Sequence, residues 1–322
     1  MKFTFKTRML ITSVLLAGAA HAQTGFPSRP IQVIAPVSPG GVADIAGRIY
    51  SEKLAKVLGQ PVVVQNRPGA GTVIGTQSVA TAAADGYTLL VTNSAFSITP
   101  FIQPGLPFDP GRDFTGVAMV AEAPAVVAIA AVSGIRNLKE LIALAKAKPG
   151  TINYSSAGIG SATHLAGALF AAKAGINIVH VPYKNYSDAN IDFIAGRVPL
   201  IFAPAGFLLP FIREGKVIAL GVSTPDDMTE PFAAPSVRKL TGLDYDFATW
   251  YGFLAPSKTP AAILDVLGKA MTQISEDPEV IAKLRGQGIN PRNVVLRDFD
   301  AYMKAEVDKI RPLINASDVK TN

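Results

Sequence analysis

The chain has 322 residues, of which 49% are hydrophobic and 17% charged, a balance that excludes intrinsic disorder for most of its length. This length predicts two lobes of moderate size. The chain has no cysteine, which excludes disulfides, thiolate zinc sites, iron–sulfur clusters and a cysteine nucleophile. With three histidines in all, a metal site made of histidine is not expected either, and we expect no cofactor.

Residues 1–22 have the features of a cleavable signal peptide. Lys2, Lys6 and Arg8 precede a short apolar segment from Met9 to Ala20, and Ala20-His21-Ala22 is a small-x-small cleavage site. The apolar segment has about 12 residues, whereas crossing a bilayer takes about 20. An uncleaved membrane anchor is therefore the weaker alternative, and we expect cleavage after Ala22.

The charge of the mature chain gives no support for a nucleic-acid partner. Loss of the three cationic residues leaves 27 Lys and Arg against 24 Asp and Glu, so the formal net charge falls from +6 to +3 and no basic cluster remains. No later stretch is long and apolar enough to span a membrane. We expect a soluble, exported protein, and the absence of cysteine fits the bacterial periplasm.

A strand–helix alternation begins at residue 31. Apolar runs predict strands at 31–36, 61–64 and 87–91, and helical spacing of apolar residues predicts helices at 45–58 and 73–84. This βαβαβ order is typical of a parallel sheet covered by helices. Residues 100–113 are rich in proline and glycine and predict a surface loop.

A second series of the same kind follows and predicts a second α/β lobe. Its expected strands are 126–132, 152–154, 178–181, 200–203 and 217–222, and its expected helices are 138–147, 162–174, 189–195 and 206–213. A strand at 250–254 and amphipathic helices at 260–275, 278–287 and 298–314 complete the chain. These last helices are expected to pack back on the first lobe, with Trp250 and Tyr251 at the lobe junction.

A glycine turn follows the first predicted strand in Pro36-Val37-Ser38-Pro39-Gly40-Gly41-Val42-Ala43-Asp44. Two glycines let the backbone turn tightly, and the first free N–H groups of the next helix lie at the same place. Such an arrangement suits an anion such as a carboxylate. The alternative is that the glycines only make the turn and Asp44 only caps or starts the helix.

A second turn of this type is Ser155-Ser156-Ala157-Gly158-Ile159-Gly160-Ser161-Ala162-Thr163-His164. Its hydroxyls and glycine N–H groups suit another carboxylate, with His164 either contacting the ligand or buried for structural reasons. The segment fails as a dinucleotide fingerprint because Thr163 occupies the third glycine position. A nicotinamide enzyme is therefore not expected.

Ser161 and His164 raise the alternative of a secreted hydrolase. The chain has no Gly-x-Ser-x-Gly elbow, and a serine and a histidine on one helical turn rarely form a nucleophile–base pair. His180, inside a predicted strand, is interpreted as structural. Tyr183 and Lys184 follow that strand. Either both side chains close over a ligand, or Tyr183 packs against the protein and Lys184 is solvated.

Several motifs resemble the tripartite tricarboxylate transporter receptors, also called the Bug family of periplasmic solute-binding proteins. The motif at residues 58–71 is the most specific of them, and together they cover nearly the whole mature chain. They are Phe26-Pro27-Ser28-Arg29-Pro30-Ile31, the turn from Pro36 to Asp44, Leu58-Gly59-Gln60-Pro61-Val62-Val63-Val64-Gln65-Asn66-Arg67-Pro68-Gly69-Ala70-Gly71, Asp85-Gly86-Tyr87-Thr88-Leu89, Ser156 to Leu165, Val181-Pro182-Tyr183-Lys184 and Trp250-Tyr251-Gly252-Phe253-Leu254-Ala255-Pro256.

The resemblance implies a two-lobed α/β fold like that of periplasmic binding proteins, with a small carboxylate held in a cleft between the lobes. The expected lobes are 23–123 with 247–322, and 124–246. The resemblance also implies delivery to the large and small subunits of a membrane transporter, and we expect a monomer. The motifs and the resemblance together assign the ligand to Val37, Ser38, Gly40, Gly41, Asn93, Ser156, Gly158, Gly160, Ser161, His164, Tyr183 and Ala203.

Three positions depart from the family pattern. Asn185 stands where members commonly have glycine, and Pro199 and Ala203 stand where they often carry an acid. An alanine at 203 cannot hold a ligand ammonium, so an amino acid becomes a less suitable ligand. The expected ligand is a carboxylate with an apolar or hydroxylated remainder.

Overall fold

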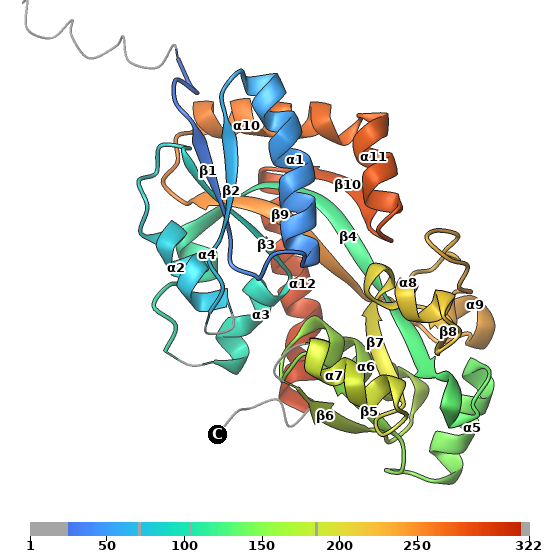
Figure 1. Ribbon diagram of the computed structural model, residues 1–322. Coiled ribbons are helices and arrows are strands. Elements are labelled where there is room, and N and C mark those ends of the chain that lie inside the picture. The colour runs from blue at the N-terminus through green and yellow to red at the C-terminus, as the bar shows by residue number, and fades with distance from the viewer. Residues whose placement is uncertain (1–24, 70–71, 104, 184–185, 317–322) are drawn as a thin grey trace, which may run out of the picture.

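The computed structural model describes residues 25–69, 72–103, 105–183 and 186–316, so the predicted signal peptide, Lys184 and Asn185 lie outside the described residues (Figure 1). Strands of the described part join in a 10-stranded sheet. They are β1 (Ile31–Ala35), β2 (Val62–Asn66), β3 (Thr88–Asn93), β4 (Phe114–Ala130), β5 (Asn153–Ser156), β6 (Val179–Pro182), β7 (Leu200–Pro204), β8 (Val217–Val222), β9 (Ala248–Pro256) and β10 (Asn290–Val295).

Helices cover both faces of this sheet. They are α1 (Val42–Leu58), α2 (Val73–Ala80), α3 (Ala95–Ile102), α4 (Pro110–Asp113), α5 (Leu138–Ala147), α6 (Ala162–Ala174), α7 (Tyr186–Ile194), α8 (Ala205–Arg213), α9 (Val237–Thr241), α10 (Ala261–Ser275), α11 (Pro278–Arg285) and α12 (Arg297–Ala316). Among the described residues, none of the helices combines the length and apolar character needed to cross a membrane.

The first three strands form the parallel unit that the alternation predicts. β1 lies between β2 and β3 and is parallel to both, so that Val33 is in register with Val64 on one side and Leu89 on the other. β9 then pairs with β3 in the antiparallel direction, which makes the sheet mixed. The strand order across the whole sheet is β2-β1-β3-β9-β4-β7-β5-β6, with β8 and β10 also paired to β4.

One long strand, β4, runs through both lobes. Residues 114–124 of β4 pair with β9, and residues 125–129 pair with β7. Pro124, which has no N–H to donate, lies at the point where the partner changes. We call the first lobe β1–β3, the first part of β4, β9 and β10 with α1–α4, α10 and α11, and the second lobe the rest of β4 with β5–β8 and α5–α9.

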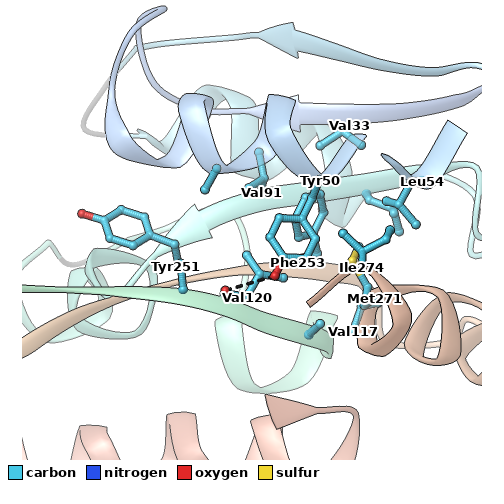
Figure 2. Close-up of a cluster of buried hydrophobic side chains, with 14 of the residues drawn as sticks. Val33, Tyr50, Leu54, Val91, Val117, Val120, Tyr251, Phe253, Met271 and Ile274 are labelled. Carbon is cyan, nitrogen blue, oxygen red and sulfur yellow. Dashed lines mark hydrogen bonds between the residues drawn. The ribbon is translucent and has the colours of Figure 1, made fainter. Parts of the chain in front are cut away.

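The first-lobe core forms between α1, α10 and one face of the sheet (Figure 2). Tyr50 of α1 is fully buried beside Phe253 of β9, and its hydroxyl donates a hydrogen bond to the carbonyl of Val120 at 3.3 Å. Gly47 lets α1 lie close to β3, because a Cβ there would be 2.9 Å from Val91. This packing fixes the first turn of α1 relative to the end of β1.

Helix α12 joins the two lobes. Its Phe299 is fully buried in a first-lobe cluster and packs edge-on against Trp250, with ring centroids 5.2 Å apart. Farther along the same helix, Ile310 belongs to the second-lobe core. The expectation that the C-terminal helices pack back on the first lobe is therefore correct for α10 and α11, but α12 also reaches the second lobe.

Two predictions about the elements were wrong, and one strand was missed. The strand expected at 126–132 is the second half of the 17-residue β4, whose first half the sequence obscures because bulges interrupt its alternation near Gly116 and Met119. The loop expected at 100–113 contains the end of α3 and the short α4. β10 was not predicted at all, because its Asn290-Pro291-Arg292-Asn293 start is polar and largely exposed.

Candidate ligand-binding site

The turn between β1 and α1 holds its glycines in place with its own hydrogen bonds. Gly40 has a φ of +85°, which favours glycine, and its N–H donates to the carboxylate of Asp44 at 2.9 Å. The N–H of Gly41 donates to the carbonyl of Ser38 at 3.3 Å. Gly41 is the N-cap of α1 and supplies no side-chain oxygen to the first helical turn.

The first turn of α1 consequently keeps open hydrogen-bond donors. The N–H groups of Val42, Ala43 and Asp44 have no partner among the described residues, as helix geometry leads one to expect for uncapped first-turn donors. In Figure 1, this end of α1 is the end of the first lobe that faces the second lobe. Ser38 is exposed beside it, and Val37 is half-buried.

Asp44 fixes the shape of this turn rather than capping the helix. It is 2% exposed and accepts hydrogen bonds from Gly40, from Arg48 and from the side-chain amide of Asn66. Burial alone would raise the pKa of Asp44, but these three donors together lower it below its ordinary value. The Asn66 amide also donates to the carbonyl of Val37 at 3.0 Å. Sequence reasoning missed Asn66 and Arg48 because neither is adjacent to the turn.

Asn93 lies at the end of β3, where the resemblance implies a cleft residue. Its side-chain oxygen accepts a hydrogen bond from the N–H of Ala95 at 2.9 Å, which fixes the orientation of the amide. Its Nδ2 has no partner within the described ranges. This amide is therefore available as a donor beside α3, and it is half-buried.

The turn between β5 and α6 uses most of its own donors internally. The N–H of Gly158 donates to Ser156 Oγ, the N–H of Gly160 to His164 Nδ1, and the N–H of Ser161 to the carbonyl of Gly158. The expectation that the glycine N–H groups of this turn hold a ligand therefore does not agree with their bonding in this structure. Their hydrogen bonds stabilise the turn itself.

The open donors of the second turn lie at the start of α6. The N–H groups of Ile159, Ala162 and Thr163 have no partner in the part of the chain that the structure describes. Ser161 is the N-cap, and its Oγ accepts from the N–H of His164 at 3.3 Å. Each lobe thus presents a helix start with unused donors directly after a glycine turn, α1 in the first lobe and α6 in the second.

The geometry of Ser161 and His164 gives no support for a hydrolase. Ser161 Oγ donates to the carbonyl of Gly158 at 2.7 Å, and Nδ1 of His164 accepts from the N–H of Gly160 at 3.1 Å. The imidazole is 5% exposed and has no hydrogen bond to the hydroxyl. A nucleophile needs a base within hydrogen-bond reach, and this pair does not provide one.

His164, which is buried, and His180, which is half-buried, form a stacked pair. Their ring centroids are 3.8 Å apart with the planes 14° from parallel. Burial lowers the pKa of His164 to about 4. Burial, and then the neighbouring His164, lower the pKa of His180 to about 3. Both rings are therefore neutral at physiological pH.

Tyr183 and Ala203, which were expected to contact the ligand, make contacts within the protein in this structure. The hydroxyl of Tyr183 donates to the carboxylate of Asp192 on α7 at 2.6 Å, and burial and that carboxylate raise its pKa to about 12. Ala203 is 0% exposed within β7. It borders a space of about 10 Å³ where Pro124, Thr163 and Thr249 meet.

A larger cavity of about 390 Å³ lies between the lobes beside α12, and no predicted site residue lines it. Glu122 and Arg292 form an ion pair of 2.8 Å at its wall. Glu306, also at the wall, accepts a hydrogen bond from the indole of Trp250. Burial raises the pKa of Glu306 to about 8, although Trp250 and Lys309 act in the opposite direction.

Comparison with known proteins gives one family. The family model described as "Tripartite tricarboxylate transporter family receptor" matches residues 46–319. BugT of Bordetella pertussis is 34% identical over 285 residues, which cover 88% of this chain and 87% of BugT.

Solved structures agree with this family. The periplasmic binding protein BugD is 27% identical with a TM-score of 0.79, covering 92% of this chain and 100% of its own. A protein of R. palustris solved with adipate is 26% identical with a TM-score of 0.82, covering 90% and 98%. These matches confirm both the two-lobed fold and the resemblance seen in the motifs. The chain belongs to the tripartite tricarboxylate transporter receptor family.

Proposed function

We propose that this protein is a periplasmic solute-binding receptor that captures a small carboxylate-containing compound and presents it to a membrane transporter. One observation carries the proposal: each lobe contributes a helix start with unused N–H donors, at α1 and at α6. The positive end of a helix dipole and its free N–H groups together bind carboxylates. The R. palustris relative solved with adipate supports this ligand class.

The donors present are sufficient for tight binding without an arginine clamp. A hydrogen bond to a charged group contributes about 1.5–3 kcal/mol. Two or three such bonds, with the apolar contacts made when the lobes close, approach the roughly 8 kcal/mol of micromolar affinity. Ser38 Oγ and Asn93 Nδ2 are further donors near the first lobe's helix start.

The ligand is held by closure of two bodies, residues 23–123 with 247–322 and residues 124–246. The change of strand partners in β4 at Pro124 supports this division, since β4 and β9 are the strands on which the lobes would pivot. A ligand that contacts α1 and α6 at once stabilises the closed arrangement over the open one. The measured affinity for the ligand therefore also depends on how readily the two lobes close.

The family supports a transporter partner and a periplasmic location. We further propose that the signal peptide is residues 1–22, that the mature protein is a monomer, and that the partner consists of a large and a small membrane subunit. A receptor of this kind needs its cleft free, which a monomer provides.

The site assignment is tested at Gly41. Its φ of −68° and ψ of 155° suit an N-cap aspartate, and an added Cβ makes only ordinary contacts at 3.5 Å or more. In Gly41→Asp the new carboxylate occupies the donors of α1, so adipate should bind at least about 10-fold more weakly, the loss of one charge-assisted bond. The free energy of unfolding should not fall, because aspartate caps the helix.

Gly41→Asn is the matched control, since asparagine caps like aspartate without the charge. Isothermal titration of both variants separates charge repulsion of the ligand from blocking of the N–H donors. The Gly41→Asp variant should lose more affinity for adipate than the Gly41→Asn variant. Wild-type affinity in Gly41→Asp would remove α1 from the site.

The ligand class is tested by thermal shift of residues 23–322 against carboxylates, amines and neutral compounds. A ligand at 100 times its dissociation constant stabilises the fold by about 2.7 kcal/mol. Shifts confined to carboxylates support the proposal, and shifts with amines or neutral compounds alone contradict it.

A further inference from the structure

His180 lies outside both ligand turns, but it touches one of them. It is on β6, which pairs with β5 in the parallel direction, so that Val181 of β6 is in register with Ser155. His180 Nε2 is 2.6 Å from Ser156 Oγ, a short hydrogen bond between two residues that are 24 positions apart. The end of β5, where the turn begins, is thus fixed from the neighbouring strand.

The bond from His180 continues into the turn. Ser156 Oγ accepts the N–H of Gly158 at 3.1 Å. A neutral imidazole has one acceptor nitrogen, and burial lowers the pKa of His180 to about 3, so the ring is neutral. In either tautomer of the neutral ring, one hydrogen bond joins His180 Nε2 and Ser156 Oγ, and Oγ also lies 3.1 Å from the carbonyl oxygen of Gly158.

A second path leads from His180 to the other glycine of the turn. The ring of His180 stacks on His164, and His164 Nδ1 accepts the N–H of Gly160 at 3.1 Å. Gly158 and Gly160 both have positive φ values, +116° and +74°, which glycine adopts readily but not exclusively in an unfolded chain. Both glycines are therefore held by a chain of contacts that starts at His180.

We propose that His180 is a positioning residue for the second-lobe half of the ligand site, acting on the β5–α6 turn through Ser156 and His164. It does not contact the ligand itself. Ser156 Oγ and His164 Nδ1, which it holds in place, accept the N–H groups of Gly158 and Gly160, and the N–H groups at the start of α6 are left to meet the ligand. The inference rests on the proposed function.

A histidine with only a packing role would behave differently. Tyr154 packs against both imidazoles, at 6.4 Å from His164 and 5.1 Å from His180, so removal of either ring also leaves a cavity. Loss of stability alone would therefore not distinguish positioning from packing. The distinguishing feature is that His180 and Ser156 form one path, so their effects on affinity should not add.

The experiment is a double-mutant cycle with adipate as the probe. His180→Leu removes the ring nitrogen that bonds Ser156 but keeps an apolar side chain, and Ser156→Ala breaks the same path at the next residue. Each single variant should bind adipate about 10-fold more weakly, and the double variant should be no weaker than the worse single variant. His180→Gln, whose amide restores a hydrogen-bond partner near the position of Nε2, should recover part of the affinity.

Val179→Ala is the matched control, because Val179 is on the same strand, is 41% exposed and makes none of these contacts. Affinity of His180→Leu within twofold of wild type, or losses that add in the double variant, would overturn the proposal. A control variant as weak as His180→Leu would do the same.

Amide hydrogen exchange tests the turn without any ligand. The N–H groups of Gly158 and Gly160 should exchange at least about 10-fold faster in His180→Leu than in wild type, while the amides of α5 do not change. Unchanged exchange at both glycines overturns the positioning role. If the wild-type protein binds no carboxylate but the exchange rates change as expected, the proposed function fails and the positioning of the turn by His180 stands.

Discussion

A single added methyl group at Gly206 should weaken ligand binding without destabilising the fold. Gly206 is in the first turn of α8, in the second lobe, and lies against the first-lobe segment that follows α11. A Cβ at Gly206 would be 2.6 Å from the carbonyl oxygen of Gln287. From the other side, a Cβ at Gly288 would be 2.6 Å from Ala205. The two lobes thus meet here backbone to backbone.

The expected changes in stability and affinity follow from two opposing effects. In a helix, alanine is more stable than glycine by up to about 1 kcal/mol, so Gly206→Ala should hold or raise the free energy of unfolding of the ligand-free protein. Overpacking a tight contact costs about 1–3 kcal/mol. If the contact forms only when the lobes close, that cost falls on ligand binding alone, and the affinity drops about 5- to 150-fold.

Three measurements on Gly206→Ala decide the matter: urea unfolding without ligand, isothermal titration with adipate, and small-angle scattering with and without adipate. The control is Gly286→Ala, in the same segment, where an added Cβ makes only contacts of 3.4 Å or more. At saturating adipate, the lobes of Gly206→Ala should stay farther apart than those of the wild type. A fall of 1–3 kcal/mol in unfolding free energy with unchanged affinity would refute the reasoning, since the contact would then be permanent.

The free energy of unfolding should depend on pH through two groups, His164 and Glu306. The depressed pKa of His164, about 4 against 6.5 in the unfolded chain, contributes stability above pH 6.5 that is lost as the pH falls; between pH 7 and 5 this amounts to about 2 kcal/mol. Urea unfolding at both pH values should therefore show a larger loss in wild type than in His164→Gln, and equal losses would contradict the buried neutral state. Glu306 has the opposite sign: its pKa is raised to about 8, so the unfolding free energy falls as the pH rises from 6 to 9. Glu306→Gln should flatten that fall, and a parallel pH profile would show that the carboxyl is ionised in the folded protein.

The sequence predicts the locations of the two glycine turns, β1–α1 and β5–α6, but not which of their N–H donors remain free. Both turns follow the ends of buried strands and contain glycine pairs that are visible in the sequence. Which N–H groups remain free depends on side chains brought from elsewhere, such as Asn66 from β2 and His180 from β6. Such pairings across strands are set by register, which no local pattern specifies.

The same limit explains which helices and strands the sequence predicts correctly. α5 and α6 match their predicted bounds, because each has a strong start signal, Asn137 and Ser161 respectively, and α6 ends at Gly175. β4 was predicted only in part, since its first half pairs with β9 from the far end of the chain. An edge strand such as β10 is stabilised by its partner rather than by its own apolar residues.

The position of β9 between β3 and β4 has a consequence for folding order. During synthesis, β3 and β4 emerge early, but the strand that must lie between them begins at Ala248, after the whole second lobe. The second lobe has its sheet residues contiguous from 125 to 222 and can form first. The first lobe keeps two unpaired strand edges until β9 arrives, so its closure requires contacts of long sequence separation, which form slowly. The order of synthesis and the order of folding are therefore reversed: the lobe whose strands are made first is completed last.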